Sequence, residues 1–430
     1  MKTVNQESNK VSAMPGGQVG GAARMPSQAH RPTLPVERYL LGVLLDALGR
    51  PALRCVLWDG SVRVAPGVVP ECDLHIRDRG ALWRLLSNPE YQFPALYVLG
   101  RVEPGDDLGH LLDVVQRARR SLDRNSLGRR LRTLLMRPRP GSVDRARDNI
   151  HSHYDLGNDF YRLWLDEQMV YTCAYFPTPA VSLEAAQTAK MDLICRKLDL
   201  QPGERVVEAG CGWGAFALHM ARHYGVKVRA FNISKSQLQW ARERAVAEGL
   251  DHAVEFVDGD YRKIDGEYDV FVSVGMLEHV GPRHYPELAA VMDRCLPNTG
   301  RGLIHTIGTD RPGPLNAWIE RHIFPGAYPP SIGQMMPLFG PAGFSILDIE
   351  NIRLHYALTL DHWHRRFEQA VDQVRERFGS EFVRAWRFYL LSSKTAFEVG
   401  HLQLFQVLFS RRGNNAVPWS RANIYRDGDL

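Results

Sequence analysis

A glycine-rich run, Gly210-Cys211-Gly212-Trp213-Gly214, is the part of the chain best suited to holding a cofactor. It follows an apolar stretch typical of a strand, and glycine is needed there because a close ligand leaves no room for a Cβ and the turn can demand a positive φ. The spacing GxGxG differs from the GxGxxG of dinucleotide sites, and Asn232 stands where a nicotinamide enzyme would carry an acid. These features favour an adenosyl cofactor other than a dinucleotide. The alternative is a tight strand-to-helix turn.

Further polar side chains follow or end other predicted strands. Asp260 and Tyr261 follow the third strand, Glu278 follows the fourth, and His305 lies at the end of the fifth. Ligands of parallel sheets bind at the carboxyl ends of the strands, so these residues are candidates for a site. Each also has a structural explanation: Asp260 as a solvated turn residue, Tyr261 as core, Glu278 as an acid favoured by a helix dipole, and His305 as a satisfied core histidine.

Alternating strands and helices must position these residues. The sequence predicts strands at residues 204–209, 226–231, 254–257, 268–274 and 302–307, and helices at 215–223 and 235–248. This alternation implies an α/β fold with a parallel, doubly wound sheet.

The chain divides into four parts. Residues 1–34, rich in Gly, Ser, Gln and Pro, are predicted to be a disordered tail, and residues 35–115 a small α+β domain. That domain contains a helix ending at Gly49 and the hairpin signal Asp59-Gly60 between two short strands. Residues 116–142 are an Arg-rich helix and linker, and residues 143–430 form the catalytic domain with the candidate site.

Charge is concentrated in the Arg-rich part. The chain has a net charge of +5, but between Arg117 and Arg147 eleven Arg face two acids, so the rest of the molecule carries −4. Such a segment could contact nucleic acid or an anionic membrane surface, or form a solvated amphipathic helix. It lacks the interleaved aromatic residues of a stacking platform, which counts against nucleic acid.

Cysteine usage and hydropathy indicate the redox environment of the protein and its relation to a membrane. The six Cys include no CxxC pair, and no His cluster has zinc spacing, so we expect reduced thiols and no metal site. No stretch reaches the roughly 18 apolar residues of a membrane span, and residues 1–34 have no signal-peptide core. The sequence predicts a cytoplasmic protein whose membrane contact is peripheral, at the inner face.

Several segments together resemble the cyclopropane fatty acid synthase family of S-adenosylmethionine-dependent enzymes. The resemblance covers roughly residues 135 to 430 and implies the Rossmann-like fold of class I methyltransferases with helical additions. The matching segments, in chain order, are HYDLGNDFY (153–161), YTCAYF (171–176), EAGCGWG (208–214), NISKSQ (232–237), DYR (260–262), GMLEHVG (275–281) and HTIG (305–308).

The resemblance also implies how S-adenosylmethionine is held. Tyr171 and Thr172 would lie over its methionine end, and Asn232 and Gln237 would reach the ribose region. Asp260 would accept from the adenine amino group, with Tyr261 beside the ring. The full implied set of cofactor-binding residues is Tyr171, Thr172, Glu208, Gly210, Gly212, Gly214, Asn232, Gln237, Asp260 and Tyr261.

The implied reaction adds a one-carbon unit to an unactivated alkene and leaves a carbocation in the pocket. Aromatic faces stabilise such a cation by about 0.5 kcal/mol each at exposed sites and by about 2 kcal/mol when desolvated. Candidates are Tyr171, Tyr175, Phe176, Tyr356 and Trp363. In the family a bound bicarbonate ion removes the proton, and the matching residues here are Cys173, Glu278, His305, Ile307 and Tyr356. Because two adjacent anions disfavour each other, the bicarbonate O–H must donate to Glu278.

The expected function is methylene transfer to a cis double bond of a phospholipid acyl chain, giving a cyclopropane. Two alternatives stay open: the same first step giving a methylene- or methyl-branched chain, and a small-molecule O- or N-methyltransferase. A non-catalytic lipid-binding protein is disfavoured by the intact cofactor loop. We expect an anionic membrane surface as partner, no nucleic acid, and, from the family, a homodimer.

Two departures from the family are visible. Ser393 stands where some members carry a cysteine once proposed as catalytic, so no thiol nucleophile acts there. Residues 93–97, Phe-Pro-Ala-Leu-Tyr, replace a Gly-Glu-Ala-Tyr-like turn, which leaves open whether the small domain binds lipid.

Overall fold

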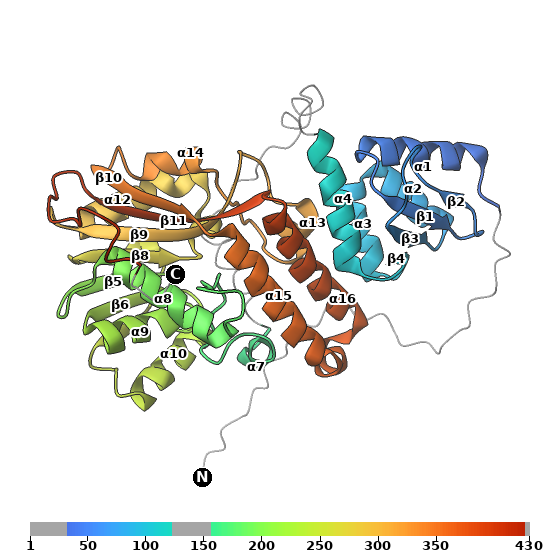
Figure 1. Cartoon of the computed structure of the whole chain (residues 1–430). Coiled ribbons are helices and arrows are strands. Elements are labelled where there is room, and N and C mark those ends of the chain that lie inside the picture. Colours follow the sequence, from blue (N-terminus) through green and yellow to red (C-terminus); the bar gives the residue numbers. More distant parts are fainter. Residues whose placement is uncertain (1–31, 123–155, 426–430) are drawn as a thin grey trace, which may run out of the picture.

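A computed structural model of the chain describes residues 32–122 and 156–425. A seven-stranded sheet with its helices lies on one side and a small N-terminal domain on the other (Figure 1). Two long helices, α15 (Arg353–Gln369) and α16 (Val371–Glu398), lie between them. Most of the predicted tail and of the Arg-rich part falls outside the described residues. Within those residues, no helix is long and apolar enough to cross a bilayer.

The N-terminal domain is built on a four-stranded sheet in the order β2-β1-β3-β4. Strand β1 pairs parallel with β3, and the other two pairings are antiparallel. The hairpin predicted at Asp59-Gly60 is confirmed, because Cys55 on β1 pairs with Arg63 on β2. The elements are α1 (Pro35–Ala47), β1 (Leu53–Leu57), β2 (Val62–Arg63), β3 (Cys72–Ile76), α2 (Arg79–Ser87), α3 (Pro89–Val98), β4 (Val102–Pro104) and α4 (Leu108–Leu122).

Both predicted boundaries of this domain need adjustment. Thr33, assigned to the tail, is only 6% exposed, and its N–H donates to Asp59 at 2.5 Å, so it is part of the domain. Helix α4 runs unbroken through residue 115, so the expected end of the domain falls inside a helix. The sequence analysis did not predict α3 or β4, and residues 93–97, where the chain departs from the family, belong to α3.

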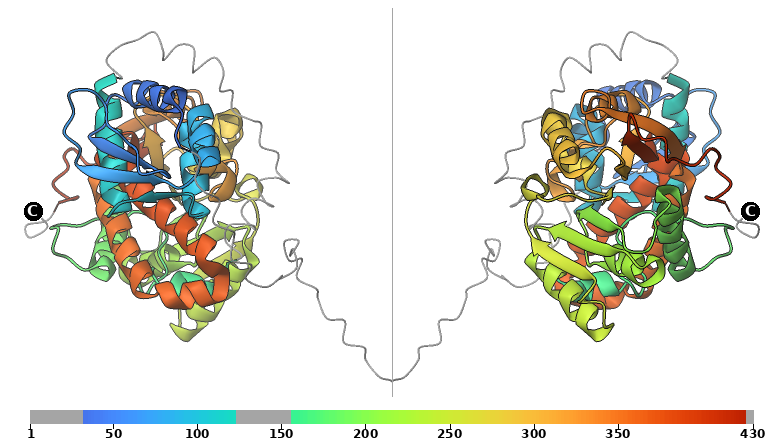
Figure 2. Two further views of the ribbon diagram at one scale, coloured as in Figure 1. Left: turned by 90° about the vertical axis from the view of Figure 1, so that its right-hand side faces the viewer. Right: turned by 90° about the vertical axis from the view of Figure 1, so that its left-hand side faces the viewer.

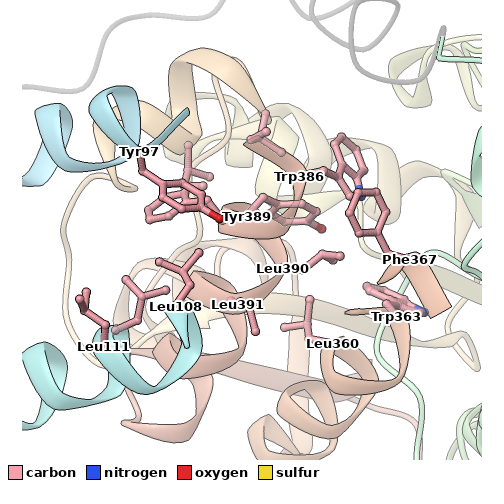
Figure 3. Close-up of a cluster of buried hydrophobic side chains, with 14 of the residues drawn as sticks. Tyr97, Leu108, Leu111, Leu360, Trp363, Phe367, Trp386, Tyr389, Leu390 and Leu391 are labelled. Atoms are coloured by element: carbon pink, nitrogen blue, oxygen red, sulfur yellow. The ribbon is translucent and has the colours of Figure 1, made fainter. Parts of the chain in front are cut away.

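The N-terminal domain shares a hydrophobic core with α15 and α16. Arg384 on α16 fixes the contact: its guanidinium lies 4.0 Å from the centre of the Tyr97 ring and donates to Glu103 at 2.8 Å. Figure 3 shows the side chains that meet at this junction. They include Tyr97, Leu108, Leu111, Leu360, Trp363, Phe367, Trp386, Tyr389, Leu390 and Leu391.

The large sheet has the strand order β10-β11-β9-β8-β5-β6-β7. Strands β9, β8, β5, β6 and β7 are parallel, and β11 runs antiparallel between β9 and β10. The predicted doubly wound sheet is confirmed, but the sequence missed β10 and β11. The strands are β5 (Arg205–Ala209), β6 (Lys227–Asn232), β7 (Val254–Asp258), β8 (Val270–Val274), β9 (Arg301–Thr309), β10 (Phe344–Asn351) and β11 (Leu402–Arg411).

Helices cover both faces of this sheet, as the right-hand view of Figure 2 shows. Alternate strand residues point to opposite sides: Val206 packs with α8, α9 and α10, whereas Val207 packs with α12 and α14. The helices of this part are α7 (Asn158–Arg162), α8 (Leu183–Leu198), α9 (Ala215–Tyr224), α10 (Lys235–Ala247), α11 (Leu277–Val280), α12 (Tyr285–Cys295), α13 (Ala317–His322) and α14 (Ile332–Met335). Single turns η1 (Tyr261–Lys263), η2 (Pro282–His284) and η3 (Met336–Leu338) complete it.

Candidate active site

The glycine loop joins β5 to α9, and each of its glycines has a positive φ. The values are 88° at Gly210, 53° at Gly212 and 82° at Gly214. A Cβ on Gly214 would lie 2.6 Å from Phe256 and 2.8 Å from Ala241, so this glycine is required by packing. A Cβ on Gly212 would meet nothing within 4 Å. The loop therefore has one face pressed onto the protein and one open face at Gly212.

Asn232, at the end of β6, braces this loop. Its amide nitrogen donates to the Gly212 carbonyl at 3.1 Å and to Gln237 Oε1 at 2.8 Å, and its oxygen accepts from the Ile233 N–H at 2.8 Å. Both amide hydrogens are thus used inside the protein. The predicted ribose role of Asn232 and Gln237 stays a prediction, and the structure adds a loop-bracing contact that the sequence did not reveal.

Asp260 and Tyr261 follow β7 and share a neighbour, Arg262. The Asp260 carboxylate accepts from the Arg262 main-chain N–H at 2.9 Å and pairs with its guanidinium at 3.0 Å. The same guanidinium lies 4.8 Å from the centre of the Tyr261 ring. Burial raises the pKa of Tyr261, whose hydroxyl has no hydrogen-bond partner among the described residues. Arg262, the third residue of the DYR segment, orients both predicted adenine contacts.

A buried carboxyl group on β5 and a buried amine on α8 influence each other's pKa. Glu208 on β5 is 2% exposed and Lys190 on α8 is 1% exposed. Burial raises the pKa of Glu208 to about 8, an effect that the positive charge of Lys190 partly offsets, and burial lowers the pKa of Lys190 to about 8. Lys190 donates to Thr172 Oγ1 at 3.0 Å. The sequence did not single out Lys190, because a lysine in a helix gives no sign of burial.

The predicted catalytic residues come from three separate segments that contact one another. Glu278 is the second residue of the short helix α11 that follows β8, and its Oε1 accepts from the main-chain N–H of Ile307 on β9 at 2.5 Å. A Cβ on Gly275, at the end of β8, would lie 2.9 Å from the Thr172 methyl group, which brings residues 171–176 against the end of β8. The structure therefore gathers Glu278, Ile307 and the segment containing Cys173.

Helix α15 closes the other side of segment 171–176. The Ala174 N–H donates to Thr359 Oγ1 at 3.0 Å, one turn along α15 from Tyr356. Cys173 is fully buried, its thiol contacts the Ala174 carbonyl at 3.1 Å, and burial raises its pKa. The thiol is therefore protonated and unsuited to act as a nucleophile.

Glu278 and His305 each present a buried polar atom that lacks a hydrogen-bond partner among the described residues. These atoms are Oε2 of Glu278 and Nε2 of His305. Burial raises the pKa of Glu278 to about 7. Burial, together with the positive charges of Lys190 and Lys197, holds the pKa of His305 well below its usual range. Buried polar atoms are nearly always paired, so Glu278 Oε2 and His305 Nε2 are each a candidate contact for a polar ligand.

Aromatic rings line the same region. Tyr171 lies 5.3 Å from Trp363, ring centre to ring centre, and Trp363 lies 5.9 Å from Tyr356. The Tyr171 hydroxyl is hydrogen-bonded to that of Tyr389 at 2.8 Å. The other two predicted aromatics stack on histidines of α15, and Tyr175 lies 4.7 Å from His355, ring centre to ring centre. Phe176 stacks on His362 at 5.4 Å.

A sequence model of the mycolic acid cyclopropane synthetase family matches residues 142–407. The chain belongs to this family. A probable fatty acid methyltransferase of Pseudomonas putida is 34% identical over 397 residues, which cover 89% of this chain and 98% of that protein. The cyclopropane-fatty-acyl-phospholipid synthase of Escherichia coli K12 is 42% identical over 270 residues, covering 63% and 69%. The solved structure of mycolic acid cyclopropane synthase CmaA1, complexed with SAH and CTAB, has a TM-score of 0.59 at 30% identity, covering 62% of this chain and 98% of that one.

This member of the cyclopropane synthetase family is an S-adenosylmethionine-dependent methyltransferase with the class I fold, as the sequence predicted. The loop fits the cofactor, since its open face lies at Gly212 and its positive φ angles suit glycine. When bound, the cofactor supplies an electrophilic methyl group on a sulfonium. The individual cofactor-binding and catalytic roles remain predictions.

Proposed function

We propose that this enzyme transfers a methylene unit from S-adenosylmethionine to a cis double bond of a phospholipid acyl chain and forms a cyclopropane. The observation that supports it is the pair of unpartnered buried atoms, Glu278 Oε2 and His305 Nε2. A methyl transfer to an O or N atom would not need this pair beside the rings of Tyr171, Tyr356 and Trp363, here called the aromatic wall. An alkene acceptor does, because closing the ring requires removal of a proton from the added carbon.

The donor and acceptor character of this pair suits a bicarbonate ion, which would supply the base. His305 would donate from Nε2, and Glu278 would accept from the bicarbonate O–H. The raised pKa of Glu278, about 7, makes proton sharing between two oxyanions feasible. The Ile307 N–H, expected to contact the anion, already donates to Glu278 Oε1, so its contribution is to orient that carboxylate.

The aromatic wall would serve the positive charge that develops on the acyl chain. Trp363, with Tyr171 and Tyr356 beside it, is fully buried, so water that would trap the cation is kept away from this surface. Desolvated cation–π contacts contribute about 2 kcal/mol or more each. Together these residues would delay collapse of the cation until the proton is removed.

A branched product is the second candidate, and the names of relatives support both. One relative is named a cyclopropane-fatty-acyl-phospholipid synthase and another a probable fatty acid methyltransferase. Expression in a host without its own cyclopropane synthase, with mass spectrometry of the lipids, measures the added mass. NMR then distinguishes ring from branch, and Glu278→Gln is the inactive control. Branched chains without a ring would favour the alternative, and unmodified lipids would contradict both.

We also propose that the Arg-rich segment binds anionic lipid. Each Arg near such a surface contributes about 1 kcal/mol. Replacing Arg129, Arg130, Arg132 and Arg137 with Gln should weaken binding to phosphatidylserine vesicles at low salt. A matched variant carries four exposed substitutions elsewhere, Arg38, Arg77, Arg283 and Arg321 to Gln. Equal loss in both variants, or none in the first, would contradict the proposal.

A further inference from the structure

A continuous line of buried polar side chains leads from α8 through β11 to His305. Lys197 on α8 donates to Gln406 Oε1 on β11 at 2.7 Å, and Gln406 Nε2 lies 3.1 Å from His305 Nδ1. Lys197, Gln406 and His305 are 3%, 0% and 1% exposed. Neither Lys197 nor Gln406 is among the site residues expected from the sequence.

The chemistry of these groups fixes the direction of each hydrogen bond. A lysine ammonium only donates, so the Gln406 carbonyl oxygen must face Lys197. The amide nitrogen, which only donates, then faces His305 Nδ1. That ring nitrogen must accept, and a neutral imidazole with an accepting Nδ1 carries its proton on Nε2.

We propose that Lys197 and Gln406 are positioning residues that hold His305 as its neutral Nε2–H tautomer. The ring then presents a hydrogen-bond donor, and no lone pair, to the anion that binds between His305 and Glu278. This inference rests on the proposed function for the role of that anion. It predicts that His305 holds the anion and is not itself the base.

The outer end of the line is anchored. Lys197 forms an ion pair with Glu350 on β10, and the Tyr425 hydroxyl donates to the other oxygen of that carboxylate at 2.8 Å. Glu350 therefore holds the ammonium in place. Protonation of His305 at Nδ1 would set an N–H against the Gln406 amide, and burial with Lys190 and Lys197 nearby opposes the imidazolium.

A purely structural role for Gln406 would require only that its volume and hydrogen bonds be kept. Gln406→Glu tests this because it is nearly isosteric and its carboxylate still accepts from Lys197. The second carboxylate oxygen, which faces the His305 ring, can only accept a hydrogen bond. The ring proton should therefore move to Nδ1, and Nε2 should carry a lone pair in place of its proton. Gln403→Glu is the matched control, since Gln403 lies on the same strand β11 and is partly exposed.

The experiment measures the ring tautomer by ¹⁵N NMR of histidine-labelled full-length enzyme, with His305→Asn used to assign the signals. Wild-type enzyme and Gln403→Glu should show the neutral Nε2–H form. Gln406→Glu should show Nδ1–H and lose about 10²-fold or more in kcat, with S-adenosylhomocysteine affinity within threefold. Turnover is followed as S-adenosylhomocysteine release, so a ring and a branch count alike.

Two outcomes would overturn the proposal. One is a wild-type His305 ring with its proton on Nδ1, a result that needs no variant to fold. The other is a Gln406→Glu enzyme with wild-type kcat. Failure of the proposed function is a separate result: lipids without a ring or branch would leave the tautomer measurement readable.

Discussion

The carboxylate of Glu278 accepts a hydrogen bond from the main-chain N–H of Ile307 at 2.5 Å, while its second oxygen has no partner among the described residues. One oxygen is thus fixed by the backbone of β9, and the other is left for a ligand. Because the group is 5% exposed, the charged form is poorly solvated and its pKa rises to about 7. The Ile307 contact thus sets the orientation of the carboxylate, whereas burial raises its proton affinity, an effect that the hydrogen bond partly offsets.

Glu278→Gln should abolish product formation while S-adenosylhomocysteine affinity stays within a few fold. The amide oxygen can still accept from Ile307, but the NH₂ group replaces an acceptor by a donor and cannot receive the O–H of an anion. Turnover and calorimetric titration measure the two effects. Glu267→Gln, at an exposed position, is the control. Full turnover by Glu278→Gln would remove the anion-site mechanism.

The buried carboxyl of Glu278 also predicts a pH dependence of stability. Between its ordinary pKa of 4.5 and the folded value of about 7, the native state holds a proton that the unfolded state has lost. Stability from this group is therefore present below pH 4.5 and is lost as pH rises through 7, by on the order of 3 kcal/mol. Burial also raises the pKa of Glu208, so its contribution to stability is likewise lost as pH rises.

The melting temperature of Glu278→Gln should therefore increase relative to that of the wild type, by a few degrees, as pH rises from 5 to 8. Glutamine resembles the protonated acid and has no charge to bury. Differential scanning fluorimetry across this range measures the difference. A constant difference between the two proteins would show that Glu278 titrates normally.

Substitutions at Gly212 and Gly214 should separate cofactor binding from folding. Gly214→Ala places a Cβ 2.6 Å from Phe256 and should lower stability by about 2–4 kcal/mol, through overpacking and an unfavourable φ. Gly212→Ala meets no protein atom within 4 Å and should cost about 1 kcal/mol, yet weaken S-adenosylmethionine binding at least tenfold. Unimpaired binding by folded Gly212→Ala would place the cofactor elsewhere.

The five parallel strands were predictable because each is a short apolar run followed by turn residues. The segment 270–274, buried at every position, is an example. Strands β10 and β11 were missed for different physical reasons. On edge strand β10, Leu347 and Ile349 are exposed, so apolar residues do not alternate regularly between buried and exposed positions. Strand β11 is buried on both faces, so its apolar run cannot be distinguished by sequence pattern from a short buried helix.

Site residues were predictable where they follow strands or match motifs, and not where burial gives them their role. Lys190 and Lys197 lie in a helical stretch whose sequence does not distinguish buried from exposed lysines. Gln406 acquires its role only from β11 pairing beside His305 on β9. The contacts of Gln406 with His305 and Lys197 join residues more than 100 positions apart and leave no local pattern.

Cys173→Ser should reduce turnover by less than threefold. The thiol is protonated and contacts the neighbouring Ala174 carbonyl at 3.1 Å, a contact that a serine hydroxyl can also make. Initial rates at saturating substrate measure the effect, with Cys295→Ser, a buried cysteine of another core cluster, as control. A loss of 100-fold with unchanged melting temperature would give the thiol itself a role.

Trp363→Leu should lower kcat by about tenfold or more, whereas Trp363→Phe should retain most activity. Leucine fills space without a π face, so the loss corresponds to one desolvated cation–π contact of about 2 kcal/mol. Trp386→Leu is the packing control, because Trp386 is also buried, at 2% exposed, and belongs to the same core cluster. Turnover is compared with melting temperature for the three variants. If Trp386→Leu, at equal loss of stability, lowers kcat as much as Trp363→Leu, packing and not cation stabilisation explains the aromatic wall.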